Sequence, residues 1–311
     1  MSDSDPFDAE PLCCLVGPTA SGKTALALDL CERMGGEVLS LDSMLVYRGL
    51  DIGTAKPSPA QQERVPHHLM DIVCPSDPYD VQQYLAAARE ALGDVQGRAA
   101  RGLFVGGTGL YLAALLRGLF EGPPVDRALR ARLEKEREEQ GAGEFHRRLA
   151  VADPKAGSRL HPNDGRRVVR ALEVLEQTGR TLSDWQAEWD GEPSARQAAA
   201  RVVGLSVDPD LLERRIRART RAMLDGGWRE EALAVRDGPG FGPSAVAALG
   251  YSDVLAWDEG RMTRAEAEEH IAIRTRQFAR RQRTWYRKFD IHWIPADAPD
   301  LLDQARAVFR C

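Results

Sequence analysis

A phosphate-binding loop motif near the start of the 311-residue chain limits the folds that this sequence can adopt. The motif is Gly17-Pro18-Thr19-Ala20-Ser21-Gly22-Lys23-Thr24, which fits G-x-x-x-x-G-K-[ST] and lies between an apolar run, Leu12–Val16, and a helical pattern, Ala25–Met34. The backbone N–H groups of such a loop turn toward an anion, and the helix N-terminus adds positive potential. Lys23 is placed to contact terminal phosphate oxygens, and Thr24 to ligate Mg²⁺. We predict a strand–loop–helix unit that binds a phosphate-bearing ligand, which the motif alone does not identify as ATP.

Apolar runs and helical patterns alternate along much of the chain. Besides the run before the motif, short strand candidates are Glu37–Leu41, Gly102–Val105, Arg201–Val207 and Ile291–Ile294. Helical patterns occupy residues 25–34, 81–96, 108–116, 208–225, 228–236, 244–258, 263–288 and 299–309, whereas residues 50–78 are mostly loop. This alternation predicts an α/β fold with a P-loop-type doubly wound parallel sheet.

The character of the sequence changes after Gly122-Pro123-Pro124. Residues 125–190 contain helical patterns, such as Arg127–Gln140 and Gly165–Thr178, and almost no β-branched run. We therefore predict a helical insertion domain over residues 120–198. Residues 12–119 and 199–311 would then form the α/β catalytic core, and residues 1–11 a disordered tail.

Composition narrows the cellular setting. The longest apolar stretches, such as Tyr111–Leu116, fall far short of the roughly 20 residues that span a bilayer. Residues 1–10 are polar and acidic, so we expect no signal peptide and no membrane partner. The five cysteines are scattered without a C-x-x-C pair, which is typical of a reducing cytoplasm rather than of disulfide or zinc modules. We expect a cytoplasmic protein, and nothing in the sequence demands a dimer.

Candidate reactive groups lie where strands are expected to end. The strand candidate Leu103–Val105 ends in Gly106-Gly107-Thr108-Gly109, without the carboxylate that usually helps to hold Mg²⁺ in nucleotide hydrolases. Thr108 could bond a phosphate, or serve as a helix N-cap. Asp42 follows another strand candidate and should lie near the phosphate loop, as a Mg²⁺ ligand, a general base or a turn-forming residue.

Basic residues are concentrated on an otherwise acidic chain. The net charge is −5, yet the segment His270–Phe289 holds seven Lys/Arg and no acid, which leaves −12 on the rest. Within it, Thr275–Arg287 mixes guanidinium, aromatic and amide side chains, a mixture that suits RNA phosphates and bases. Arg166, Arg167 and Arg170 form a further cluster on a predicted helix. These clusters indicate a localised anionic partner.

With these residues assembled, the chain resembles the tRNA dimethylallyltransferases, also called tRNA isopentenyl-diphosphate transferases. The resemblance covers about residues 12–295. It rests on the phosphate loop and on these further segments: Leu41-Asp42-Ser43, Val46–Pro57 with its Asp-Ile-Gly-Thr-Ala-Lys-Pro run, Pro66–Leu69, Gly106–Tyr111, Asn163–Val174, Gly250-Tyr251 and Thr275–Arg287.

The resemblance implies transfer of a dimethylallyl group from dimethylallyl diphosphate to N6 of the adenine 3′ to the anticodon, in tRNAs that read codons beginning with U. It implies that Asp42 is the general base, that Thr108 and Arg219 act at the diphosphate end, and that Lys23 and Thr24 hold diphosphate and Mg²⁺. It also implies contacts with the tRNA anticodon stem-loop from the insertion domain and the core. The residues expected to make them are Asp42, Ser43, Met44, Leu45, Arg166, Arg167, Arg170, Gly250, Tyr251, Thr275, Arg276, Gln277, Arg280, Arg281 and Gln282.

The sequence departs from the family pattern at places that bear on RNA selectivity. The family often has Gln where this chain has Leu45, and Ala247 and Ser252-Asp253 replace more polar or basic residues.

Two other functions are compatible with the phosphate loop and the basic clusters. A P-loop small-molecule kinase using ATP explains the loop but not the Arg-rich helix, whereas an RNA-binding ATPase needs an acidic strand end that the sequence lacks.

Overall fold

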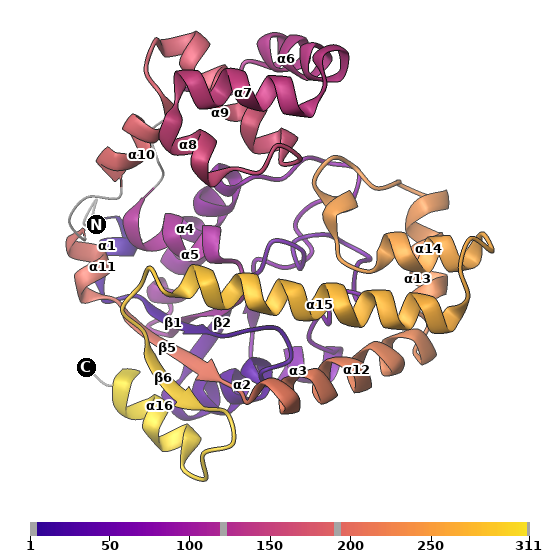
Figure 1. Cartoon of the computed structure of the whole chain (residues 1–311). Coiled ribbons are helices and arrows are strands. Elements are labelled where there is room, and N and C mark those ends of the chain that lie inside the picture. The colour runs from indigo at the N-terminus through magenta and orange to yellow at the C-terminus, as the bar shows by residue number, and fades with distance from the viewer. Residues whose placement is uncertain (1–4, 119–122, 190–193, 310–311) are drawn as a thin grey trace. The chain divides into compact units, whose positions relative to one another are not determined.

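The computed structural model describes residues 5–118, 123–189 and 194–309. The chain divides into two compact units, one made of Met1–Leu116 with Ala195–Cys311 and the other of Arg117–Ser194 (Figure 1). The second unit occupies nearly the stretch that we expected as the insertion, residues 120–198.

A six-stranded sheet forms the centre of the first unit. Its strands are β1 (Cys13–Val16), β2 (Gly36–Leu41), β3 (His67–His68), β4 (Arg101–Gly106), β5 (Arg201–Ser206) and β6 (His292–Pro295). They lie in the order β3-β2-β4-β1-β5-β6, and every pairing is parallel, which confirms the predicted fold class. Strand β3 falls in the stretch expected as loop, because two histidines carry no hydrophobic pattern to mark a strand.

Helices cover both faces of this sheet. The helices of this unit, in chain order, are α1 (Pro6–Ala9), α2 (Lys23–Met34), α3 (Pro59–Arg64), α4 (Val81–Gly97), α5 (Gly109–Arg117), α11 (Ala195–Ala199), α12 (Pro209–Asp225), α13 (Trp228–Asp237), the 3₁₀ turn η1 (Ala245–Ala247), α14 (Tyr251–Asp258), α15 (Arg264–Tyr286) and α16 (Leu301–Phe309). Val38 of β2 packs into a core with α2 and α16, whereas its neighbour Leu39 lies toward Leu92 of α4. Successive strand residues point to opposite faces, so the sheet is buried on both.

Two expected elements differ in the structure. Residues 5–11 of the predicted tail are ordered: Phe7 is 1% exposed, and its ring lies under the guanidinium groups of Arg89 and Arg196. The helix expected over 244–258 is split into η1 and α14. Gly250 at the break has a φ of 94°, and a Cβ there would lie 2.2 Å from Trp228, so this position requires glycine.

The register of the sheet aligns the carboxyl ends of its central strands. Val16 of β1 pairs with Gly106 of β4 and Gly204 of β5, and Leu41 of β2 also pairs with Gly106. The segments that follow these strands therefore emerge at one edge of the sheet. Ligands bind at this edge in open parallel α/β sheets.

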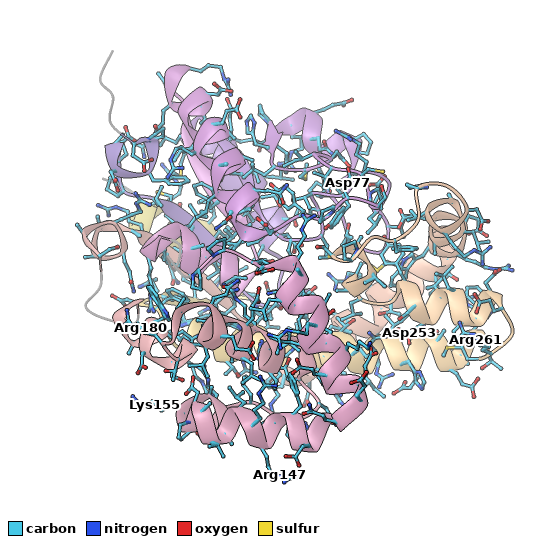
Figure 2. All side chains as sticks on the ribbon, turned by 90° about the horizontal axis from the view of Figure 1, so that it is seen from above. Asp77, Arg147, Lys155, Arg180, Asp253 and Arg261 are labelled. Atoms are coloured by element: carbon cyan, nitrogen blue, oxygen red, sulfur yellow. The ribbon has the colours of Figure 1, made fainter. Side chains whose placement is uncertain are left out.

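The second unit has a core of its own. It contains α6 (Arg127–Gln140), α7 (Ala142–Ala152), α8 (Pro154–Arg159), α9 (Gly165–Thr178) and α10 (Leu182–Trp189). Leu133, Phe145 and Leu172 are among its fully buried side chains, whereas charged residues such as Arg147 and Lys155 project away from its helices (Figure 2). Within the described part of the chain, no helix is both long and apolar enough to cross a membrane.

Candidate active site

The phosphate loop joins the end of β1 to the start of α2. Gly22 precedes the helix with a φ of 97°, a conformation that a side chain would strain. The Lys23 ammonium donates hydrogen bonds to the carbonyl oxygens of Gly17 and Pro18, both at 2.9 Å. The loop thus places a cation and the N-terminus of a 12-residue helix at the sheet edge, the combination that binds phosphate.

The ends of β2 and β4 are joined beside this loop. The Leu41 carbonyl accepts hydrogen bonds from the N–H groups of Gly107 and Thr108, at 3.2 and 3.1 Å. The Thr108 hydroxyl accepts from the Ser43 N–H at 3.0 Å, and its carbonyl accepts from Leu112 N–H, so Thr108 also begins α5. Thr108 therefore lies beside Ser43 at the start of α5, and its role at the diphosphate end stays a prediction.

Asp42 faces two cations across this edge. Its Oδ1 accepts a hydrogen bond from the Met44 N–H at 2.8 Å. Burial raises the pKa of the Asp42 carboxyl, although the N–H groups of Met44 and Leu45 and the charges of Lys23 and Arg219 act in the opposite direction. A carboxylate that is costly to keep ionised is better suited to take up a proton.

The two cations are themselves desolvated. Burial lowers the pKa of Lys23 to about 8, with Asp42 raising it and Arg219 lowering it further. Burial also lowers the pKa of Arg219, while Asp42 raises it. Arg219 reaches the loop from α12, where it donates a hydrogen bond to the Thr19 hydroxyl at 2.6 Å. The site therefore holds two poorly solvated cations that an anionic ligand would stabilise.

Two cavities meet at these residues. The first, of about 780 Å³, follows the phosphate loop, and the second, of about 510 Å³, lies between the end of β2 and helices α12 and α15. Their linings share Thr19, Asp42, Thr54 and Arg219. The two cavities are therefore neighbours on either side of Asp42 and Arg219, and the first contains the cationic phosphate loop.

Thr54 is held at this junction by a carboxylate that sequence analysis missed. Glu231 of α13 accepts hydrogen bonds from the N–H groups of Asp51, Ile52 and Gly53 at 2.8, 2.7 and 3.0 Å, and from the Tyr251 hydroxyl at 2.6 Å. Four donors on one carboxylate fix the 51–54 turn. No local pattern marks Glu231, because its three backbone partners lie about 180 residues earlier in the chain.

The expected RNA-contacting residues of the first unit fall into two groups. Arg280 and Arg281 of α15 are exposed, and Gln277, Thr275 and Arg281 line the second cavity with Ser43 and Met44. Arg276 is also exposed and pairs with Glu213 at 3.0 Å. In contrast, Gln282 and Tyr251 are 4% and 2% exposed. Their side chains bond inside the protein, so the structure does not place them on a surface that RNA could reach.

The remaining residues expected to contact tRNA lie in several different environments. Gly250 packs against Trp228, and Leu45 lines the first cavity rather than the second. On the second unit, Arg166 and Arg167 are exposed, Arg167 beside Asp164 at 3.3 Å. Arg170 instead pairs with the fully buried Glu173 at 3.0 Å and donates to the Pro123 carbonyl at 2.6 Å. We therefore assign Arg170 a structural role, because removing it would leave a buried carboxylate with less compensation.

The donor set of the site fits Mg²⁺ bound together with phosphate oxygens. Thr24 lines the first cavity, and its hydroxyl is an oxygen ligand of the kind that this ion prefers. Among the described residues, no group of three or more His, Cys, Asp or Glu could hold a metal. The described residues therefore do not form a metal site made of protein ligands alone. They fit a Mg²⁺ ion that is bound by Thr24 together with diphosphate oxygens.

Comparison with known proteins places this geometry in a family. The family model for IPP transferase matches residues 45–289, and the model for isopentenyl transferase matches residues 11–70. A tRNA dimethylallyltransferase of Geobacter sulfurreducens is 44% identical over 281 residues, covering 89% of each chain. That of Geobacillus kaustophilus is 41% identical over 288 residues, covering 92% of this chain and 90% of the relative.

Solved structures agree with these matches. A full-length tRNA isopentenylpyrophosphate transferase from Bacillus halodurans is similar with a TM-score of 0.69 and 34% identity, over 96% of this chain and 95% of that one. A eukaryotic dimethylallyltransferase acting on tRNA is similar with a TM-score of 0.76 and 26% identity, over 96% of this chain and 78% of that one.

Proposed function

This chain belongs to the IPP transferase family, and on that premise we propose that it transfers a dimethylallyl group from dimethylallyl diphosphate to N6 of the adenine 3′ to the anticodon. Its enzyme class is that of its relatives, the tRNA dimethylallyltransferases, and the kinase alternative is not favoured. The observation that carries the proposal is the pair of neighbouring cavities that share Asp42 and Arg219 in their linings. These cavities can hold a diphosphate ester on one side of the Asp42 carboxylate and a nucleobase on the other.

Asp42 supplies the base for this reaction. A bond forms between adenine N6 and C1 of the dimethylallyl group, the C1–O bond to diphosphate breaks, and the N6 proton passes to the Asp42 carboxylate. The exocyclic amine is a weak nucleophile because its lone pair is delocalised. Proton removal by a positioned carboxylate contributes roughly 10²–10⁴-fold.

The groups around the phosphate loop act on the leaving diphosphate. Lys23, Arg219 and the loop N–H groups face the negative charge that develops as the C1–O bond breaks, and the Thr108 hydroxyl lies at the same edge of the sheet. We propose that Thr24 ligates Mg²⁺ with diphosphate oxygens, and that the ion neutralises part of this charge when bound. Carbocation character at C1 must be kept from water, so the adenine itself should close the second cavity after leaving its stack.

The acceptor RNA would lie over the outer end of the second cavity. We propose that it is the anticodon stem-loop of tRNAs reading codons that begin with U. Arg281 lines this cavity and is exposed, Arg276 and Arg280 are also exposed on α15, and Arg166 and Arg167 are exposed on the second unit. We further propose a cytoplasmic enzyme that acts as a monomer.

A transfer assay tests this function directly. The protein is incubated with labelled dimethylallyl diphosphate, Mg²⁺ and unmodified tRNA, and the nucleosides are then analysed. We expect label on N6 of the adenosine next to the anticodon. A folded protein that labels no tRNA, but hydrolyses or transfers from ATP, would overturn the proposal in favour of the kinase alternative.

The pH dependence of kcat/KM for dimethylallyl diphosphate should have two limbs. Asp42 must be ionised to accept a proton, and its raised pKa moves the acidic limb above the range of an ordinary carboxyl. Lys23 must be protonated to bind diphosphate, and its lowered pKa places the basic limb near pH 8. Activity should therefore rise through the first limb and fall through the second. In Lys23→Arg the guanidinium stays protonated, so a basic limb that persists unchanged would contradict this assignment.

Replacing Arg280 and Arg281 together by alanine should weaken tRNA binding and flatten its salt dependence. Both side chains are exposed on α15, and removing one side chain that binds a phosphate should reduce the slope of log K against log salt by about 1. The slope is measured by titrating tRNA at several salt concentrations. A slope equal to that of the wild type would mean that these arginines do not contact phosphates.

A further inference from the structure

Gln282, on the buried face of α15, contacts Thr19, the third residue of the phosphate loop. The Gln282 side chain is 4% exposed. Its Oε1 accepts a hydrogen bond from the Thr19 N–H at 2.9 Å, and its Nε2 donates one to the Gly107 carbonyl at 2.9 Å. One amide therefore bridges the loop after β1 and the loop after β4. Four residues later, the Tyr286 hydroxyl donates to the Gly17 carbonyl at 3.1 Å.

The glycines after β4 leave the space that this bridge occupies. A Cβ at Gly107 would lie 2.1 Å from Gln282 Nε2, and a Cβ at Gly109 would lie 2.8 Å from Trp285. Real Cβ atoms do not approach other atoms this closely, so a larger residue at either position would push α15 or its side chains away. The Gly-Gly-Thr-Gly sequence at 106–109 is thus matched to the helix that packs on it.

The bridge joins the loop that carries Lys23 to the loop that carries Thr108. Thr19 is held at its N–H by Gln282 and at its hydroxyl by Arg219, at 2.6 Å. Gly107 precedes Thr108, whose hydroxyl is bonded to the Ser43 N–H. Moving Gln282 would therefore change the spacing between the phosphate loop, Arg219 and Thr108.

We propose that Gln282 is a positioning residue for the diphosphate end of the reaction. The identity of the ligand rests on the proposed function, but the bridge itself does not. Gln282 acts through Thr19 and Gly107, which it holds in the geometry that binds a diphosphate. It belongs to the helix whose exposed face carries Arg276, Arg280 and Arg281, yet it does not face RNA itself.

Only an amide satisfies both ends of the bridge. Thr19 N–H needs an acceptor and the Gly107 carbonyl needs a donor, and a primary amide supplies one of each. Glutamate at this position keeps an acceptor, but it opposes the Gly107 carbonyl and adds negative charge near the diphosphate. Methionine preserves the length and volume of the side chain but serves neither partner.

The first test compares Gln282→Met with Arg280→Ala on the same helix. The affinity for inorganic diphosphate is measured by calorimetry, and the affinity for tRNA by titration. Losing the partners of a buried donor and a buried acceptor should weaken diphosphate binding by about 10- to 100-fold in Gln282→Met, with tRNA affinity unchanged. Arg280→Ala should show the reverse. Diphosphate binding like the wild type, with weakened tRNA binding, would make Gln282 an RNA contact and overturn the proposal.

A double-mutant cycle tests the same bridge if a single variant folds poorly. Gly107→Ala should displace the Gln282 amide and weaken diphosphate binding much as Gln282→Ala does. The combined variant should then lose less than the sum of the two, because the alanines no longer collide. Additive losses would overturn the proposal. A wild-type protein that binds no diphosphate would instead count against the proposed function, so the two failures are distinguishable.

Discussion

Asp42→Asn should lower the rate of the chemical step by roughly 10²–10⁴-fold, the usual contribution of a positioned general base. Asparagine keeps the size of the side chain and can still accept the hydrogen bond from the Met44 N–H. It cannot take up the N6 proton. The rate is measured in a single turnover with enzyme in excess over tRNA, so that product release does not obscure it.

The same substitution should not weaken binding of the donor. Asp42 is an anion that lies near Lys23 and Arg219 and competes for their charge. Its removal should leave the affinity for inorganic diphosphate unchanged or tighter, with tRNA affinity unaffected. Asp77→Asn is a matched control, since Asp77 is exposed and lies outside both cavities. An unchanged single-turnover rate in Asp42→Asn would eliminate Asp42 as the base.

Much of the fold follows from local patterns. The phosphate-loop motif and four apolar runs are enough to predict parallel strands with crossover helices, because parallel strands need such connections. Strand β3 could not be predicted in this way. His67 and His68 pair with Val38 and Leu39 of β2 through backbone bonds, and His68 is fixed by Glu37 at 2.6 Å. Tertiary pairing, not side-chain pattern, makes this short strand.

The residues of the candidate site likewise include some that local sequence patterns predict and others that only tertiary contacts reveal. Lys23 and Asp42 could be placed from the sequence because each follows a strand that ends at the ligand edge. Glu231 and Gln282 could not, because their roles consist of contacts with residues more than 170 positions away. The sequence pattern around Gln282 predicts an RNA-binding helix but not which of its faces is buried. The sequence pattern also does not reveal the buried Glu173 that pairs with Arg170.

Arg219→Ala should lower kcat by about 10²–10³-fold, the cost of removing one group that stabilises a developing anion. Arg219 lies where the two cavities meet, and it is bonded to the Thr19 hydroxyl. Arg219→Lys should recover part of the rate, because it restores the charge but not the planar set of donors. Steady-state kinetics with tRNA at saturation provides the measurement.

The stability of Arg219→Ala separates this role from a structural one. Burial lowers the pKa of Arg219, which means that the folded protein holds this cation at a cost. Removing it should therefore leave the melting temperature unchanged or higher while activity falls. Arg221→Ala on the same helix, where Arg221 is exposed and pairs with Glu268 at 2.7 Å, controls for the loss of one positive charge and should keep the affinity for inorganic diphosphate. A fall in kcat that simply follows a loss of stability would show that Arg219 supports the helix rather than the leaving group.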